Sequence, residues 1–574
     1  MTAANNSENR PRVTLPQGTV VGVTQHGAYP NPVDAFLGIP YAQPPTGDLR
    51  FRPPVKVAKA APGEEEKIID ASQFGPRAPA KQFLIIGPKL KESEDCLTAN
   101  VFRRAAADAV TGEKEEKRLP VAIYMHGGAF NRGNAAMHDT ASMVGWSAAP
   151  FVAVSFGYRI GALGFLPSGL SSKEGALNLG LKDQILMMEW VQENIHLFGG
   201  DKDNVTLIGL SAGAHSIGHH LLNYEEGKPP LFHRIVMESG APTSRAVRHF
   251  DAEIHEQQFQ DFLAAVNCPK DTPESEIFPY LRSLPIDVLA AAQTKVFYNY
   301  NPSLRWAFQP VIDGKIIRQR PIDAWRKGEW NKMPIMTGFN GNEGSLYVDK
   351  QMSTSEQFTA FWKTLLPQLS DADVATINGL YPDPTADPSS KYKVEGPLAE
   401  KGGVGAMYKR IEAAYAHYAY VAPARQTADL AGSQGAPVYL YHWALEKSVV
   451  NGAAHGENML YEVRDPEVCG VSPAQDELSR VLHAYVTSFI CTGDPNGVVG
   501  DGGVKRPRWE AHSCGDGEAK VKMVFGKDNK EFVGGGGAGD DGKSPLPPPA
   551  ELVEDIWAKT ESDFWWDKVG ISQQ

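Results

Sequence analysis

Residues 204–220, NVTLIGLSAGAHSIGHH, contain the pattern that decides the fold. An apolar run at 204–210 leads into Gly209-Leu210-Ser211-Ala212-Gly213, a G-x-S-x-G motif, and the residues after it can form a helix. In a strand–turn–helix setting this motif places its serine on a strained turn, where a Cβ atom at either flanking position would clash. The hydroxyl group then projects above the sheet at the N-terminus of a helix, whose dipole favours negative charge. The pattern therefore predicts that Ser211 is a nucleophile.

Further apolar runs without polar alternation precede this motif. LPVAIYMH at 119–126 and FVAVSFGYR at 151–159 are typical of strands that are covered on both faces, as in a parallel sheet. Between 151–159 and 204–210, residues 179–200 carry apolar side chains at helical spacing and end at two glycines. This alternation of strands and helices predicts an α/β fold with a large, mostly parallel, twisted sheet and helices on both faces.

The rest of the chain extends this arrangement, with a largely helical middle part at about 245–430 and a closing helix at 550–569. The charged run at 111–118 predicts a solvated hairpin tip, and the Gly- and Pro-rich residues 533–549 predict a flexible loop. Further short strands are expected at 18–23, 35–39, 97–103 and 438–443.

A turn of small residues, His126-Gly127-Gly128-Ala129-Phe130, directly follows the first apolar run. Small residues after a strand allow backbone N–H groups to point into a cavity, and a tetrahedral oxyanion needs two or three such donors. Taken alone, this turn fits a glycine-rich loop without a ligand equally well. Its position upstream of the serine motif favours an oxyanion-binding role.

A serine nucleophile needs a base, and the base needs an acid. In this fold the chain order is serine, then acid, then histidine, which points to Glu343 in TGFNGNEGSLY and His455 in NGAAHGENM. Both lie in loops after apolar strands, where catalytic groups collect. Spacing alone does not place them above Asp349 and His442. The histidines of the helix after Ser211, which we expect to be packed or solvated, are His215, His219 and His220.

The composition excludes several classes of protein. The 574 residues include 56 Lys and Arg against 68 Asp and Glu, a net charge of −12 with no long basic run, which argues against a nucleic-acid-binding protein. The most apolar stretch, 151–166, is interrupted by Arg159 and glycines, so no membrane span is predicted. The N-terminus has no apolar leader segment, and none of the five cysteines forms a C-x-x-C pair. These features predict a reduced, cytoplasmic location and no zinc site.

Longer segments, ordered along the chain, are collectively very specific: FLGIPYAQPPTGDLRF (36–51), SEDCLTANVF (93–102), MHGGAF (125–130), GYRIGALGFL (157–166), residues 178–216, LFHRIVMESGAP (231–242), GFNGNEG (338–344), AAHGENMLY (453–461) and TGDPN (492–496). On these segments the chain resembles the type-B carboxylesterase/lipase family, the cholinesterase-like branch of the α/β-hydrolases. The resemblance implies the α/β-hydrolase fold, a single domain over residues 1–574, and hydrolysis of small-molecule carboxylic esters without a metal ion or cofactor. It leaves the oligomeric state open.

The resemblance also assigns roles to single residues. It implies that Ser211 is the nucleophile, Glu343 the acid and His455 the base. It implies an oxyanion hole made by the N–H groups of Gly128, Ala129 and Ala212. Two further matches are Ser239, which corresponds to a serine near the triad, and Glu94 with Arg159, which correspond to a structural ion pair.

Departures from the family pattern bear on the substrate. Leu210 stands where the family usually has Glu or Gln before the serine, so a charge beside the nucleophile is missing. The loop 79–95 carries no Trp that could stack on a choline group, and its apolar piece 83–86 could form part of a lid. Ala78 replaces the cysteine that the family pairs with Cys96. We therefore expect uncharged, apolar esters as substrates.

Two other functions compete with ester hydrolysis. An acyltransferase or an amidase would use the same triad with a different acceptor or substrate, and the sequence does not separate them. A non-catalytic adhesion module, such as the neuroligin-like members of the family, would predict a lost nucleophile, a secretion signal and a membrane span, none of which is seen in the sequence.

Overall fold

The computed structural model describes residues 10–60, 67–81, 87–105, 118–498, 504–512, 519–533 and 547–572. Three predicted features fall wholly or mostly outside these ranges. They are the lid piece at 83–86, residues 111–117 of the expected hairpin tip, and residues 534–546 of the expected flexible loop.

Within the described ranges, eleven strands form one sheet, in the order β14 (Ala550–Glu554), β13 (Val521–Phe525), β12 (Val438–Trp443), β11 (Ile335–Asn340), β10 (Arg234–Glu238), β9 (Gly200–Leu210), β7 (Leu119–Met125), β8 (Val152–Phe156), β6 (Thr98–Arg104), β4 (Val33–Pro40) and β3 (Val23–Gln25). The strands from β13 to β8 pair in parallel, and the outer strands pair antiparallel. The predicted apolar runs thus lie in the parallel part of the sheet. A small second sheet contains β1 (Arg12–Leu15), β2 (Gly18–Val21) and β5 (Ile68–Asp70).

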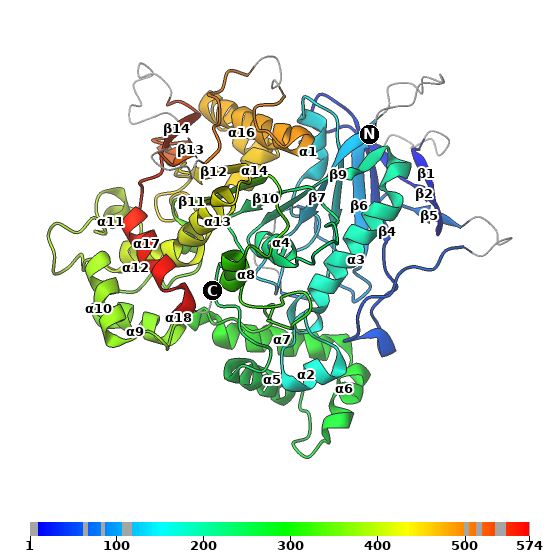
Figure 1. Cartoon of the computed structure of the whole chain (residues 1–574), viewed down its shortest axis with the longest axis horizontal. Coiled ribbons are helices and arrows are strands. Elements are labelled where there is room, and N and C mark those ends of the chain that lie inside the picture. Colours follow the sequence, from blue (N-terminus) through cyan, green and yellow to red (C-terminus); the bar gives the residue numbers. More distant parts are fainter. Residues whose placement is uncertain are drawn as a thin grey trace.

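Helices surround this sheet (Figure 1). In the described ranges they are α1 (Thr140–Trp146), α2 (Gly169–Glu174), α3 (Leu179–Asn194), α4 (Ala212–Leu222), α5 (Glu253–Ala265), α6 (Glu274–Ser283), α7 (Ile286–Tyr300), α8 (Pro321–Lys327), α9 (Ser355–Leu365), α10 (Asp371–Leu380), α11 (Pro397–Lys401), α12 (Tyr408–Ala416), α13 (Ala422–Ser433), α14 (Asn458–Glu462), α15 (Pro466–Cys469), α16 (Pro473–Thr492), α17 (Lys559–Asp567) and α18 (Val569–Ser572). The predicted helical middle part therefore exists as α5 to α13, although it also contains the central strand β11.

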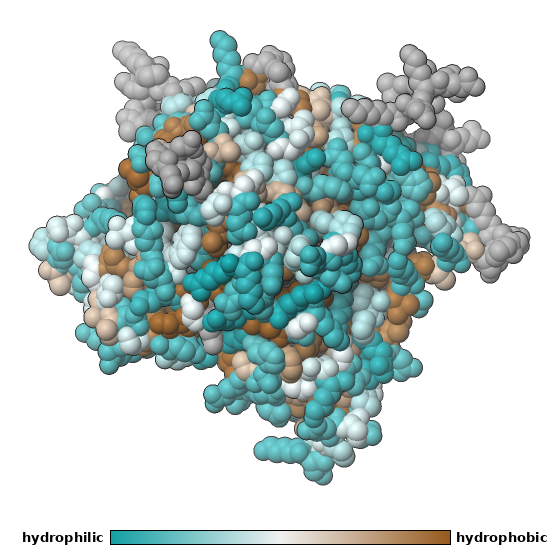
Figure 2. Space-filling view, viewed as in Figure 1, coloured by the Kyte–Doolittle hydropathy of each residue, from teal (hydrophilic) through white to brown (hydrophobic). Residues whose placement is uncertain are grey.

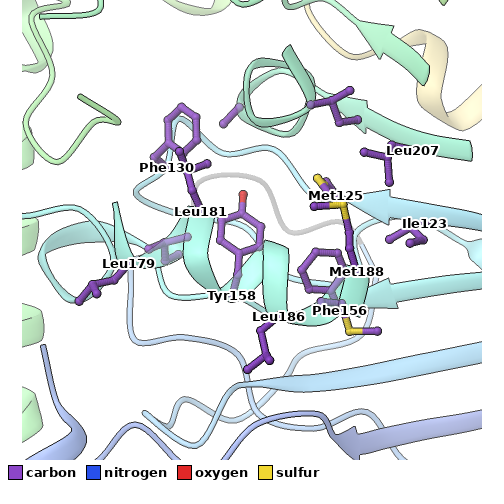
Figure 3. Close-up of a cluster of buried hydrophobic side chains, with 14 of the residues drawn as sticks. Ile123, Met125, Phe130, Phe156, Tyr158, Leu179, Leu181, Leu186, Met188 and Leu207 are labelled. Carbon is purple, nitrogen blue, oxygen red and sulfur yellow. The ribbon is translucent and has the colours of Figure 1, made fainter. Parts of the chain in front are cut away.

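Both faces of the central strands are buried, which explains their continuous apolar runs. On β7, Ile123 and Met125 belong to the cluster that includes α3, α4 and α13, whereas Tyr124 belongs to the cluster that includes α1, α14 and α16. Figure 3 shows Leu181 and Met188 of α3 in the first cluster, together with Met125. Alternate side chains of one strand thus anchor helices on opposite faces of the sheet, and the predicted α/β class is confirmed.

The predicted closing helix at 550–569 is wrong in its first part. Residues 550–554 form β14, which pairs antiparallel with β13, and the helix α17 begins at Lys559. A strand at the edge of a sheet exposes unpaired N–H and C=O groups. On one side of β13 these groups form hydrogen bonds with β14. The free energy gained from this pairing outweighs the helical propensity of the segment.

Hydrophilic residues cover most of the face that Figure 2 shows. On the face seen in Figure 2, hydrophobic residues occur in small groups between hydrophilic ones. Among the helices in the described ranges, none combines the length and apolar character needed to cross a membrane.

Candidate active site

Ser211 lies between β9 and α4 with a backbone φ of 58° and ψ of −121°. Flanking glycines make this turn possible, because a Cβ atom on Gly213 would lie 2.0 Å from the carbonyl oxygen of Met125, and one on Gly209 would lie 2.7 Å from the carbonyl carbon of Gly213. The Ser211 N–H donates to the carbonyl oxygen of Glu238 at 2.9 Å, which ties the turn to β10. The strained turn that the motif predicts is therefore present, and close backbone packing holds it.

Glu343 and His455 come together from loops that follow neighbouring parallel strands. Glu343 begins the 3₁₀ turn η6 (Glu343–Leu346) after β11, and His455 lies in the connection after β12. His455 Nδ1 lies 2.5 Å from Glu343 Oε2 in a hydrogen bond, and the Asn340 N–H donates to Glu343 Oε1 at 2.7 Å. Glu343 is fully buried, so both of its oxygens are fixed by these bonds rather than by water.

The second nitrogen of His455, Nε2, is buried and has no hydrogen-bond partner in the described chain. Ser211 and His455 line the same cavity, but no hydrogen bond joins them. In enzymes without a bound substrate, catalytic hydrogen bonds are often long and tighten only in the complex. One nitrogen of His455 is thus held by a carboxylate, and the other is left without a partner in the described chain on a residue that lines the cavity.

The two residues that the sequence left as alternatives lie elsewhere. His442 is a residue of β12, packed 4.5 Å from the ring of Trp557, and burial together with Lys522 and Arg425 holds its pKa well below the usual value. Asp349 accepts a hydrogen bond from the N–H of Gln351 and does not line the cavity. Neither is brought next to Ser211.

The turn at 126–130 is the loop whose backbone N–H groups are predicted to bind the oxyanion, and its backbone conformation is unusual. Gly128, Ala129 and Phe130 have φ values of 115°, 55° and 60°. A Cβ atom on Gly128 would lie 2.1 Å from the carbonyl oxygen of Arg132, so only glycine fits there. Asn131 Nδ2 donates to the Ala129 carbonyl oxygen at 2.9 Å, which holds this carbonyl in place. Gly128 and Ala129 line the cavity with Ser211.

Ala212 is the first residue of α4 and follows Ser211 directly. The N–H groups of the first helical turn have no acceptor within the helix, and they carry the positive end of its dipole. Ala212 is fully buried and is not among the residues that line the cavity. The structure therefore places the three predicted oxyanion donors on the two backbone turns next to the serine.

The histidines of α4 are packed, not solvated. Burial lowers the pKa of His219 to about 4 and that of His220 to about 3, and His220 Nε2 lies 2.8 Å from Gln184 Oε1. His215 Nδ1 lies 3.1 Å from the carbonyl oxygen of Ala241. These side chains belong to the core under the serine turn.

The ion pair implied by the resemblance is wrong. Glu94 accepts two hydrogen bonds from Arg50, at 2.6 and 2.7 Å, whereas Arg159 donates to both oxygens of Asp183 at 2.7 and 2.8 Å. A guanidinium group binds one carboxylate best when it donates two parallel bonds, and each arginine makes this bidentate contact with a different acid while its Nη1 donates to backbone carbonyl groups. Ser239 is fully buried, its hydroxyl group has no hydrogen-bond partner among the described residues, and it does not line the cavity.

The cavity at Ser211 has a volume of about 240 Å³. Most of its wall is apolar, but Arg132, Lys447 and Glu457 also line it. Sequence analysis missed these three charged residues. Glu457 lies two residues after His455, and this short spacing is the only signal that could have revealed it. The large aliphatic side chains of the wall are Met137, Leu210, Leu346, Met459 and Leu460, and the aromatic rings of Tyr124 and Tyr347 also line it.

Comparison with known proteins shows the family of this chain. The model of the Carboxylesterase family matches residues 9–530. The chain belongs to the carboxylesterase family. It is 33% identical over 515 residues to "Secreted lipase 4" of Gibberella zeae, covering 88% of each chain, and 30% identical over 512 residues to "Lipase 1" of Geotrichum candidum, covering 82% of this chain and 85% of the relative. The enzyme is therefore an ester hydrolase.

A solved structure supports the fold of the enzyme. The crystal structure of Aspergillus niger EstA matches 98% of this chain and 99% of its own chain with a TM-score of 0.78 and 24% identity. The α/β-hydrolase fold expected from the resemblance is confirmed.

The predicted cytoplasmic location is contradicted by these relatives. "Secreted lipase 4" and "Secreted triacylglycerol lipase LIP1", both of Gibberella zeae, are named as secreted proteins, and the second is 29% identical to this chain over 556 residues. The prediction relied partly on unpaired cysteines, which are a poor guide here. Cys96 is buried and burial raises the pKa of its thiol, so it resists oxidation in any compartment.

Proposed function

We propose that the enzyme, acting as a single α/β-hydrolase domain, hydrolyses carboxylic esters through a triad of Ser211, His455 and Glu343. One observation carries this proposal: His455 is hydrogen bonded to the buried carboxylate of Glu343 at 2.5 Å and shares a cavity with a serine on a strained turn. A carboxylate that holds Nδ1–H fixes the tautomer in which Nε2 can accept a proton.

The chemistry follows from the positions of these groups. Ser211 attacks the ester carbonyl carbon while His455 Nε2 accepts the hydroxyl proton, and Glu343 stabilises the imidazolium ion that forms. The N–H groups of Gly128, Ala129 and Ala212 bind the oxyanion. His455 then protonates the leaving alcohol, and water repeats both steps on the acyl-enzyme.

We propose uncharged esters with an apolar acyl part as substrates. The apolar majority of the cavity wall supports this, as does Leu210, which puts an isobutyl group where a carboxylate would favour a cation. The names of the relatives, which are called lipases, point the same way.

Covalent labelling tests the proposal directly. A fluorophosphonate probe should form an adduct on Ser211 of the wild-type enzyme, and mass spectrometry of the digested protein identifies the site. The Ser211→Ala variant should take up no label and should lose ester hydrolysis, while Ser433→Ala, which removes a surface hydroxyl group, should behave as the wild type. Labelling of another serine, or more than a few per cent of the wild-type kcat in Ser211→Ala, would mean that the nucleophile is wrongly assigned.

A further inference from the structure

The wall of the cavity that follows β12 is not uniformly apolar. Residues 447–460 contribute Lys447 and Glu457 to this wall, alongside the apolar Met459 and Leu460. Among the described residues that line the cavity, Glu457 is the one carboxylate, since Glu343 lies behind His455 and does not reach the surface. A charged group that faces a mostly apolar cavity is costly unless it has a partner, and a polar group of a substrate is one such partner.

One of the two carboxylate oxygens of Glu457 already accepts a hydrogen bond from the protein. Its Oε2 accepts a hydrogen bond from the Ala454 N–H at 2.9 Å, and this bond holds the side chain against the loop that carries His455. The other oxygen, Oε1, accepts no hydrogen bond within the described chain, yet it is not sealed inside the protein. The group is therefore anchored by one oxygen and can accept a hydrogen bond from a ligand with the other.

The position of Glu457 indicates which half of an ester it would meet. In the proposed mechanism, His455 Nε2 protonates the leaving alcohol, so the alcohol half must lie on the His455 side of the cavity. Glu457 lies two residues after His455 and is bonded to the residue before it. The donor loop with Gly128 and Ala129, which would bind the carbonyl oxygen, comes from the separate strand β7.

We propose that Glu457 is a specificity-determining residue that accepts a hydrogen bond from a hydroxyl group of the substrate's alcohol half, so that the enzyme prefers esters of polyols such as glycerol over alkyl esters of the same shape. This inference rests on the proposed function, because the His455 side is the alcohol side only if His455 is the base. The substrate would then place a hydroxyl group of its alcohol half at Glu457 and an apolar acyl chain against the apolar part of the cavity wall.

The ionisation of Glu457 provides an independent readout. Burial and the nearby Glu531 raise its pKa to about 7, against the lowering effects of the Ala454 N–H and Lys447. The other titratable or charged groups around it are His455 on the same loop, Tyr461 on α14, and Arg132, which also lines the cavity. An ionised carboxylate accepts a hydrogen bond more strongly than a carboxylic acid, so binding of a hydroxyl group should improve as the pH rises through 7.

The test compares two matched esters, 2,3-dihydroxypropyl butyrate and 2-methylbutyl butyrate, which differ by hydroxyl groups in place of methyl groups. The measured quantity is the ratio of their kcat/KM values. In the wild type this ratio should rise by up to about 10-fold from pH 6 to pH 8, because the ionised fraction of a group with a pKa of about 7 rises from about one tenth to about nine tenths. Effects of His455 ionisation act on both esters and cancel in the ratio.

Two variants complete the experiment. Glu457→Leu should lower the ratio at pH 8 by about 10-fold or more while still hydrolysing 2-methylbutyl butyrate. Glu457→Gln, which keeps an acceptor for the Ala454 N–H, should fold as the wild type and show a ratio that no longer depends on pH. Glu400→Leu, the same change at an exposed position on α11, is the control and should leave the ratio unchanged.

The inference is overturned if both Glu457 variants keep the wild-type ratio and its pH dependence, or if both esters lose activity equally. The latter result would mean that Glu457 only supports the loop of His455. Failure of the proposed triad is a separate outcome, since it would appear as hydrolysis that survives Ser211→Ala.

Discussion

The turn at Ser211 and the loops of Glu343 and His455 meet at one cavity, but they are built in different ways. The turn is made by adjacent residues, and the contacts of Gly209 and Gly213 with nearby backbone atoms force its shape. The Glu343–His455 pair joins residues that are 112 positions apart, through a single side-chain hydrogen bond. A local motif is thus held by excluded volume, whereas the distant pair is held by hydrogen bonds between loops that the sheet places side by side.

The largest effect is expected at the distant pair. His455→Ala should lower kcat by about 10⁶-fold, similar to the loss of the nucleophile, because the two residues act as a unit. The measurement is kcat on a neutral butyrate ester at saturating concentration. His442→Ala is the matched control, since this histidine is buried in β12, and its removal should change stability more than activity. An inactive His442→Ala with an active His455→Ala would reverse the choice of base.

The acid should matter less than the base. Glu343→Gln should lower kcat by about 10⁴-fold, because the amide can still hydrogen bond to the ring but does not stabilise the imidazolium ion. Asp349→Asn serves as the control and should keep nearly full activity, since Asp349 does not line the cavity. A loss of less than 10-fold in Glu343→Gln would show that another group supplies the negative charge.

Added bulk in the turn at Ser211 should displace the nucleophile by a steric clash. Gly213→Ala would place a Cβ atom 2.0 Å from the Met125 carbonyl oxygen, so either the turn or β7 must shift. We expect kcat/KM to fall by about 100-fold or more, because displacement of the nucleophile by about 1 Å has effects of this size. The Tm should also fall. Gly227→Ala, at a position where a Cβ atom would meet no neighbour, is the control for added bulk, although its positive φ carries a small strain of its own. A fully active Gly213→Ala would show that the turn tolerates a side chain.

A smaller loss of kcat is expected when the hydrogen bonds of Asn340, which link the Glu343 loop to the His455 loop, are removed. Asn340 Nδ2 donates to the Ala454 carbonyl oxygen at 2.6 Å, and its backbone N–H donates to Glu343. Asn340→Ala removes this side-chain bond and a second one, from Nδ2 to Asn458 Oδ1 at 3.3 Å, and leaves the Ala454 carbonyl oxygen with only the 3.3 Å bond from the Glu457 N–H. The loss of two buried hydrogen bonds costs about 1–3 kcal/mol of folding stability. We expect kcat to fall about 10-fold with KM nearly unchanged, as measured by steady-state kinetics, together with a lower Tm. Asn378→Ala, in the helical part at α10, should lower Tm without changing kcat.

The smallest effect concerns the cavity rather than its catalytic groups. Butyrylcholine and 3,3-dimethylbutyl butyrate should differ by less than about 10-fold in kcat/KM at physiological salt, with no preference for the cation. Among the described residues of the wall, the positive charges of Arg132 and Lys447 outnumber the carboxylate of Glu457, so the local charge disfavours an ammonium group. A preference for choline above 10-fold would mean that the aromatic rings of Tyr124 and Tyr347 or the carboxylate of Glu457, which also line the cavity, bind the ammonium group.

The sequence by itself determined the local features. The glycines around Ser211 and at Gly128 are steric requirements of neighbouring backbone, and continuous apolar runs are requirements of strands covered on both faces, so both can be found without knowing the fold. For the same reason the α/β class and most of the strand positions were predictable. The family resemblance, rather than spacing, favoured Glu343 and His455 over Asp349 and His442.

Tertiary structure alone decided the features that depend on which loops become neighbours. The Arg50–Glu94 and Arg159–Asp183 pairs replace the Glu94–Arg159 pair that the family resemblance implied, since a guanidinium group binds the carboxylate that packing presents to it. The segment at 550–554 forms a strand because its backbone groups pair with the N–H and C=O groups at the edge of β13, which would otherwise lack a strand partner on that side. Glu457 lines the cavity with Ser211 and His455, and its carboxylate is held by the Ala454 N–H, an arrangement that no local sequence pattern encodes. These interactions form only after distant segments are packed together, and for this reason one-dimensional patterns do not contain them.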